Sequence, residues 1–140
     1  MKMLALSLGL DLVYGYDGSA FMDWNETEEW AKPYIAALVQ SGIVYGSQNA
    51  DGFYINANVP IVREEMIAMV VHALGVDPSG SLGYASDISA VSDWAADYVQ
   101  YVLKHEMIKL DGENKVNPHV NAIRADTAMM LYKMIEYLGI

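Results

Sequence analysis

Trp30-Ala31-Lys32-Pro33-Tyr34-Ile35 recurs 64 residues later as Trp94-Ala95-Ala96-Asp97-Tyr98-Val99, and this recurrence decides the fold. Each copy is followed by a second matching segment, Ile55-Asn56-Ala57-Asn58-Val59 in one and Val116-Asn117-Pro118-His119-Val120 in the other. The chain's two arginines, Arg63 and Arg124, come next at equivalent places 61 residues apart. The intervening loop is therefore three residues shorter in the second copy. An internal repeat predicts the architecture before any single element does.

Apolar residues recur at helical spacing on both sides of each long loop, which predicts a helix, a loop and a second helix in every repeat. We expect the first helix to start near Asn25, because Asn25 and Glu28 form a capping-box pattern, and to end at Gly42. The second helix should begin within 61–63 and close at Gly75. The sequence thus predicts an all-α fold with short extended pieces at most, near Phe53–Ile55 and Lys115–Asn117.

The first residues of the chain resemble the end of a repeat. Leu8-Gly9-Leu10 matches Leu74-Gly75-Val76 and Leu138-Gly139-Ile140, each of which closes a second helix. The sequence therefore predicts a closing helix at 1–12, a whole repeat at 13–76 and another at 77–140, together forming one compact domain. A closing helix without its opening partner would leave apolar surface exposed, so we also expect self-association, most simply as a homodimer.

Composition excludes several classes of function. The chain has 140 residues, 54% of them hydrophobic, and a net charge of −10, which disfavours binding to nucleic acid or anionic lipid. It lacks cysteine and any apolar run of about 18 residues, so disulfides, thiolate chemistry and membrane insertion are not expected. An anionic ligand would need a local cationic group to hold it.

The pattern resembles the S-layer homology family. The residues that carry the resemblance are Phe21-Met22-Asp23, Trp30 to Ile35, Gly42-Ile43-Val44-Tyr45-Gly46, Ile61-Val62-Arg63-Glu64-Glu65-Met66, Asp93-Trp94-Ala95-Ala96-Asp97-Tyr98 and Ala122-Ile123-Arg124-Ala125-Asp126. The resemblance implies helix–loop–helix repeats around a pseudo-threefold axis. It also implies a non-catalytic module, extracellular at the bacterial cell surface, that binds pyruvylated secondary cell-wall polysaccharide in grooves between repeats.

The family's Thr-Arg-Ala-Glu segment supplies its ligand-binding arginine, which corresponds to Arg63 and Arg124 here. The threonine is replaced by Val62 and Ile123, so neither residue can cap its helix through a hydroxyl. The glycine turn at Gly42 to Gly46 is replaced by Glu106-Met107-Ile108-Lys109-Leu110 in the second copy. On this ground we expect Arg63 to matter more for binding than Arg124.

A guanidinium in the first turn of a helix could hold the carboxylate of a pyruvylated amino-sugar, because free backbone N–H groups point the same way. The alternative is a structural ion pair of the arginine with Glu64, Glu65 or Asp126. If Arg63 binds ligand, Arg63→Ala should weaken glycan binding and leave the melting temperature nearly unchanged.

The other candidate ligand-binding residues are Trp30, Trp94, Gly46, Asp23 and Asp87. The tryptophans could stack on a sugar face, although packing is a common use of such residues. The two aspartates could bind sugar hydroxyls or simply form turns at helix entries. We expect no catalytic residues, metal site or cofactor, because no triad, phosphate loop or metal-ligand spacing occurs. A protein–protein assembly module without carbohydrate binding is the alternative function, and an enzyme with an unrecognised carboxylate pair is a third.

Overall fold

The computed structural model describes residues 1–140 and divides them into two compact units, Met1–Val59 (unit 1) and Pro60–Ile140 (unit 2). Its regular elements are five α-helices, three short 3-10 helices and one two-stranded hairpin. The prediction of a mainly helical fold is thereby confirmed. No helix is both long enough and apolar enough to cross a bilayer.

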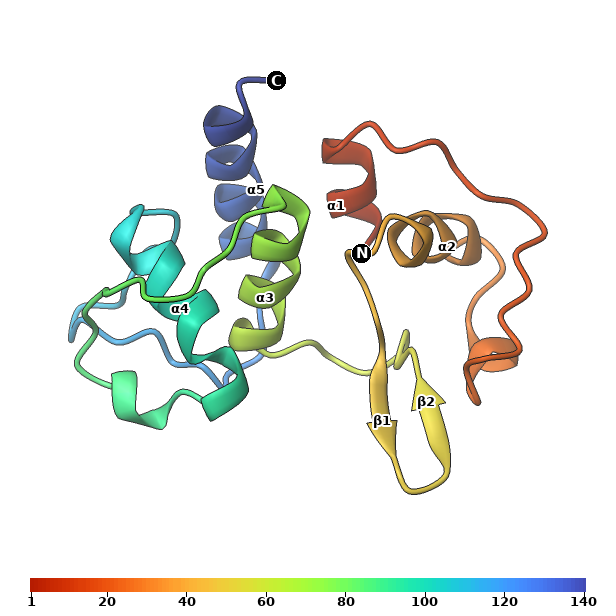
Figure 1. Ribbon diagram of the computed structural model, residues 1–140, viewed down its shortest axis with the longest axis horizontal. Coiled ribbons are helices and arrows are strands. Elements are labelled where there is room, and N and C mark those ends of the chain that lie inside the picture. The colour runs from red at the N-terminus through yellow and green to blue at the C-terminus, as the bar shows by residue number, and fades with distance from the viewer. The chain divides into compact units, whose positions relative to one another are not determined.

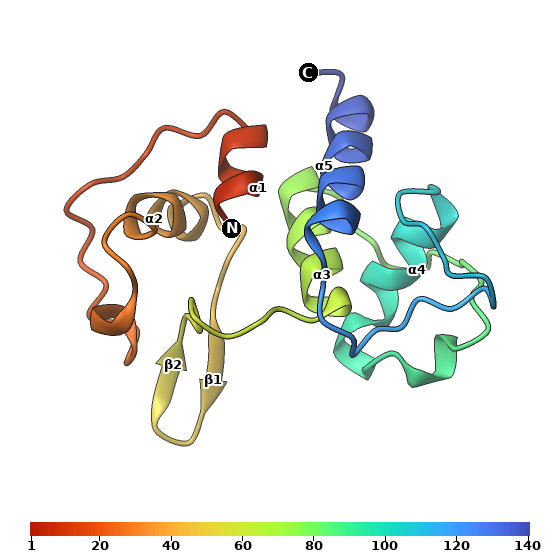
Figure 2. The ribbon, with the colours of Figure 1, turned by 180° about the vertical axis from the view of Figure 1, so that it is seen from behind.

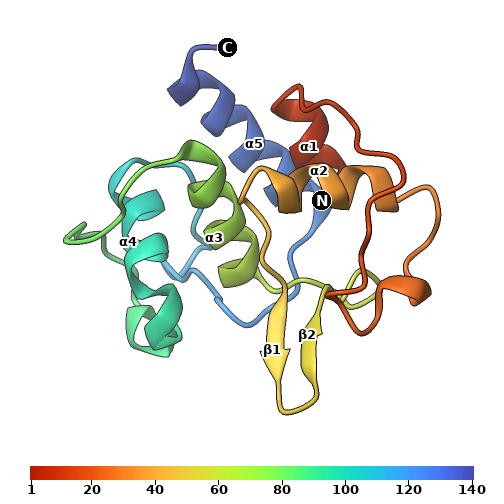
Figure 3. The same cartoon turned by 45° about the vertical axis from the view of Figure 1, so that its right-hand side comes forward.

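Unit 1 contains two α-helices and the hairpin (Figure 1). Its elements are α1 (Lys2–Ser7), the 3-10 helix η1 (Trp24–Glu26), α2 (Lys32–Gln40), β1 (Ser47–Asn49) and β2 (Gly52–Tyr54). Helix α1 packs on α2, and β1 pairs antiparallel with β2 so that Ser47 lies opposite Tyr54. Figure 3 shows the chain leaving α2 and entering β1 through a short connection. The hairpin confirms the extended stretch expected around Phe53.

The first helix of unit 1 starts later than the sequence predicts. The Asn25–Glu28 capping box does not form, because residues 24–26 are a 3-10 helix that ends at the extended residue Thr27. Helix α2 begins only at Lys32, with Pro33 in its first turn, where a missing N–H costs little. Consequently, Trp30 lies in the turn before the helix and not on the helix itself.

Unit 2 is built around α3 (Arg63–Leu74), which contacts both α4 (Ala96–Lys104) and α5 (Arg124–Leu138), as Figure 2 shows. Two 3-10 helices, η2 (Ile88–Ala90) and η3 (Asp93–Ala95), precede α4. The three α-helices share a core of fully buried apolar side chains that includes Ile67, Val70, Val71, Val99, Val102, Met130 and Met134. The Lys115–Asn117 segment is not a strand.

Glycine ends each of the three helices that the sequence identifies as closing helices. Gly9, Gly75 and Gly139 have φ values of 63°, 64° and 70° just after α1, α3 and α5. This left-handed conformation stops a helix at no steric cost to glycine. The Leu-Gly match at the three sites therefore reports a shared helix end. The pseudo-threefold arrangement and the repeat limits 13–76 and 77–140 stay predictions.

Candidate functional site

Asp23 and Asp87 occupy equivalent places and make equivalent contacts. The Asp23 carboxylate accepts the backbone N–H groups of Ile55 at 2.8 Å and Asn56 at 2.7 Å. Asp87 accepts those of Val116 and Asn117, both at 2.8 Å. Each aspartate also precedes a 3-10 helix, so it ties the start of its repeat to the loop before the second helix. Two charge-assisted hydrogen bonds per carboxylate thus shape each loop.

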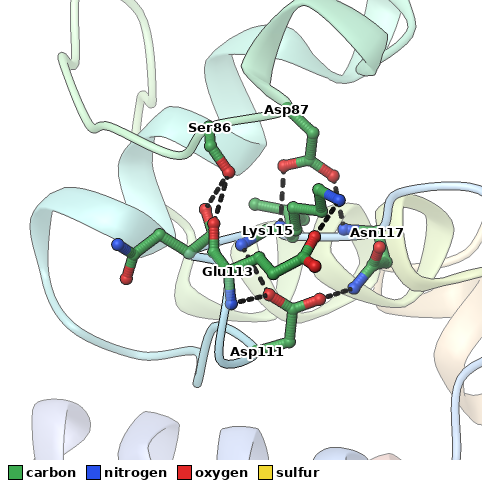
Figure 4. A network of polar contacts seen from close by, with 8 residues as sticks. Ser86, Asp87, Asp111, Glu113, Lys115 and Asn117 are labelled. Carbon is green, nitrogen blue, oxygen red and sulfur yellow. Dashed lines mark hydrogen bonds and ion pairs between the residues drawn. The ribbon is translucent and has the colours of Figure 1, made fainter.

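The loop held by Asp87 has a polar network of its own, shown in Figure 4. Asp111 accepts the N–H groups of Glu113 and Lys115 at 2.8 and 2.9 Å, and the Asn117 amide at 2.8 Å. The Asn117 amide and then these backbone groups lower the pKa of the Asp111 carboxyl below its ordinary value. The Asp111 carboxylate thus organises a turn, and no group of three or more His, Asp or Glu side chains in the chain is placed to hold a metal ion.

Arg63 is the first residue of α3, as predicted, and only 7% of its surface is exposed. Its Nε donates to the Val116 carbonyl at 2.6 Å, its Nη2 lies 3.3 Å from the Lys109 carbonyl, and its Nη1 pairs with the Asp126 carboxylate. Asp126 is one of the three ion-pair partners that the sequence offers for an arginine. The guanidinium therefore has intramolecular acceptors on three sides.

The first turn of α3 also has acceptors for its backbone. The N–H of Arg63 donates to the Val120 carbonyl at 2.9 Å, and that of Glu64 donates to the Pro118 carbonyl at 3.0 Å. Glu65 accepts the Val62 N–H at 3.0 Å, which is the glutamate half of a capping box, and the valine side chain cannot form the other half. These groups would otherwise be available to an anion at the start of α3.

Glu64 is a residue whose role the sequence did not reveal. It is 3% exposed, and its carboxylate accepts the Ser92 N–H at 3.0 Å and the Ser92 hydroxyl at 2.6 Å. The His119 Nε2 lies 3.4 Å from the same carboxylate. Ser92 is the N-cap residue of η3, so Glu64 fixes the start of the following helical segment. The sequence does carry one signal for Glu64: the two copies differ here, since Ala125 stands at the equivalent position in the second copy.

Arg124 has different surroundings from Arg63, although it is likewise the first residue of its helix, α5. It is exposed and makes no hydrogen bond or ion pair. The backbone N–H groups of Arg124 and Ala125 also lack a partner within the chain. A free guanidinium and free N–H groups thus coincide at the start of a helix of 15 residues.

Trp30 and Trp94 are exposed, with 61% and 54% of their surface accessible. Neither side chain is buried in a core, so each ring has exposed surface on which a sugar could stack. Trp24 differs: it is 8% exposed and packs against Tyr16 and Phe21, with ring centroids 5.4 and 6.3 Å away. Trp24 is therefore a packing residue of unit 1.

Gly46 is required by backbone geometry. Its φ is +74°, and a Cβ there would lie 2.6 Å from the Tyr54 carbonyl oxygen. The turn that ends at Gly46 begins at Gly42, whose φ is 68°. In the second copy Glu106 replaces Gly42 and adopts φ 52°. The second copy thus keeps the turn conformation with a residue that is less suited to it.

The candidate residues divide between the two units. Unit 1 contains Asp23, Trp30 and Gly46, whereas unit 2 contains Arg63, Asp87, Trp94 and Arg124. Hydrogen bonds connect the loop that contains Val116 to both Asp87 and Arg63. Within unit 2, one loop is therefore shaped by two of the predicted site residues.

Comparison with known proteins identifies a family. The chain matches the S-layer homology domain over residues 20–67 and 86–128, which is more than half of its length. It is 27% identical over 114 residues to the surface-layer 125 kDa protein of Lysinibacillus sphaericus, covering 79% of this chain and 9% of that protein.

Two further relatives carry the names of enzymes. Identity is 30% over 117 residues to an amylopullulanase of Thermoanaerobacterium thermosulfurigenes, covering 79% of this chain and 6% of that protein. It is 30% over 113 residues to exoglucanase XynX of Acetivibrio thermocellus, covering 77% of this chain and 10% of that protein. The chain therefore spans a tenth or less of the length of these relatives.

The matched domain is a non-catalytic anchoring domain of surface proteins. The paired positions Trp30 and Arg63, and Trp94 and Arg124, lie inside the two matched segments. The chain belongs to the S-layer homology family, and its location is extracellular, at the bacterial cell surface.

Proposed function

We propose that the chain anchors a surface protein to the bacterial cell wall by binding pyruvylated secondary cell-wall polysaccharide without catalysis. The observation that carries the proposal is the exposed, unpaired Arg124 at the start of α5, beside free backbone N–H groups. In a chain of net charge −10, an anion binds only where a local cation offsets the repulsion. A pyruvyl carboxylate has the charge and the planar shape that a guanidinium fork recognises.

In this proposal the two arginines have different tasks. Arg124 contacts the ligand, whereas Arg63 positions the loop that contains Lys109 and Val116 through the hydrogen bonds of its guanidinium. This reverses the order expected from the sequence, because the more family-like turn accompanies the arginine that is buried. The exposed tryptophans Trp30 and Trp94 offer sugar-stacking surfaces.

In this proposal Asp87 shapes a loop of unit 2, and Asp23 and Gly46 shape the equivalent loop of unit 1. Both carboxylates already accept two backbone N–H groups each, so their main contribution is to hold the loops in place. Gly46 allows the turn that leads into the hairpin. Substitution at these positions should alter loop order and, through it, ligand affinity.

The test is binding to purified cell-wall sacculi with and without their secondary polymer, together with calorimetry on a pyruvylated N-acetylhexosamine glycoside. Arg124→Ala should lose about tenfold or more in affinity, since charge-assisted hydrogen bonds are worth about 1.5–3 kcal/mol. Lys133→Ala is the matched control, because it removes an exposed cation of the same helix, α5. Equal losses of affinity in both variants would show that Arg124 contributes only through the net charge of the chain.

The same sacculi separate this function from the alternative. A module for protein–protein assembly would bind stripped and intact sacculi equally and would be indifferent to Arg124→Ala. The predicted homodimer is a separate proposal, in which the exposed Leu6 of α1 is part of the contact. Light scattering at several concentrations tests it, and a monomer at every concentration would contradict it.

A further inference from the structure

Unit 1 has an aromatic cleft with a volume of about 460 Å³. Its walls are the linker 12–16, the buried Trp24 and the residues around the start of α2. Five of its eleven lining residues are aromatic, namely Tyr14, Tyr16, Trp24, Trp30 and Tyr34, although aromatic residues make up only 11% of the chain. Its volume falls within the range of about 300–1,000 Å³ that is typical of small-molecule sites.

The floor of the cleft is held in place, while its rim is open. Gly18 lies against the Trp24 ring so closely that a Cβ would come within 2.1 Å of it, and Tyr16 packs edge-on against the same ring. At the rim, Tyr14 is 76% exposed and Trp30 is 61% exposed. Exposed aromatic rings beside a fixed floor are typical of a binding surface and not of a core.

The polar groups at the cleft favour an uncharged ligand. Lys32 forms an ion pair with Glu29, so these two lining residues cancel in charge while keeping a donor and an acceptor. The Lys2 Nζ lies 5.7 Å from the ring centre of Trp30, and besides Glu29 unit 1 has six carboxylates and no arginine. The surrounding field therefore repels anions, in contrast to the free guanidinium of Arg124 in unit 2.

We infer that this cleft is a second saccharide subsite, which takes an uncharged sugar residue of the wall polymer. The apolar face of the ring stacks on Trp30 and Tyr14, and its hydroxyls bond to Glu29 and Lys32. The inference rests on the proposed function, since it assumes that the ligand is a wall polysaccharide. It adds that the chain recognises the neutral part of that polymer separately from its carboxylate.

The test uses tryptophan fluorescence of the full chain that carries Trp94→Phe, in which both remaining tryptophans, Trp24 and Trp30, line the cleft. The probe is purified wall polysaccharide from which the pyruvyl groups have been removed. Its addition should change the emission saturably. Tyr14→Ala should weaken that binding by about threefold to tenfold, the value of one aromatic contact.

Tyr84→Ala is the matched control, because Tyr84 is 75% exposed in unit 2 and does not line the cleft. No saturable change in emission, or the same loss in the Tyr84 and Tyr14 variants, would overturn the inference. If intact sacculi still bind in an Arg124-dependent way while the depyruvylated polymer leaves the emission unchanged, the cleft is not a subsite and the proposed function stands. If the depyruvylated polymer binds but Arg124→Ala has no effect on sacculi, the cleft stands and carboxylate recognition fails.

Discussion

Removing the Arg63 side chain should destabilise unit 2, which is the opposite of the small effect expected from the sequence. The side chains of Arg63 and Asp126 are 8% and 30% exposed, so water cannot fully replace the lost partner. Breaking a buried ion pair from one side costs about 3–5 kcal/mol, and the partial exposure of Asp126 puts the effect at the lower end, about 3 kcal/mol. For a chain of this size, that lowers the melting temperature by roughly 10 °C.

The assay is urea unfolding followed by circular dichroism, for the wild type, Arg63→Ala, Asp126→Ala and the double variant. The coupling free energy from this cycle should be about 1–3 kcal/mol, because the two groups are in direct contact. Arg124→Ala is the control, and as an unpaired surface residue it should shift stability by no more than about 0.5 kcal/mol. A loss below about 1 kcal/mol for Arg63→Ala, or additive single variants, would refute the reasoning.

Arg63→Lys separates charge from geometry in the same assay. Lysine keeps the positive charge but cannot reach the Val116 carbonyl and the Asp126 carboxylate with one planar fork. We therefore expect Arg63→Lys to unfold between the wild type and Arg63→Ala. Full recovery by lysine would show that the pair acts through charge alone and that the hydrogen bonds contribute little.

Three further predictions concern the backbone and pH. Gly46→Ala should destabilise unit 1 by about 1 kcal/mol or more, since its Cβ would meet the Tyr54 carbonyl, and a drop in the urea midpoint checks this. Glu106→Gly should raise the free energy of unfolding by up to about 1 kcal/mol by relieving φ 52°, and a drop in the urea midpoint would contradict this. Burial and the Tyr137 hydrogen bond raise the pKa of Tyr101 to about 12. Because the raised pKa favours the neutral form in the folded state, its stabilisation is complete below pH 10 and fades as pH rises towards 12. The check is an absorbance titration of tyrosinate together with unfolding at high pH. In Tyr101→Phe the ionisation of Tyr101 near pH 12 and this loss of stability should both be absent.

The helix ends and the arginine positions were predictable because they depend on local chemistry. Gly75 and Gly139 end their helices through a backbone conformation that glycine adopts freely. The leucine before each glycine helps to identify these helix ends in the sequence. Arg63 and Arg124 begin α3 and α5 as expected, because their place follows from the repeat itself. The start of α2 was not predictable from Asn25, since the turn there is shaped by contacts of Asp23 with residues more than 30 positions away.

The sequence by itself determined the repeat, the helical class, the glycine helix ends and the family, because each follows from residue spacing along the chain. Only the tertiary structure decided that Arg63 is buried against Asp126 while Arg124 stays exposed without a partner. Two residues at the same place in a repeat have the same local conformation but not the same neighbours in space. Hydrogen bonds and ion pairs depend on distances through space, and Asp126 reaches Arg63 from 63 residues further along the chain.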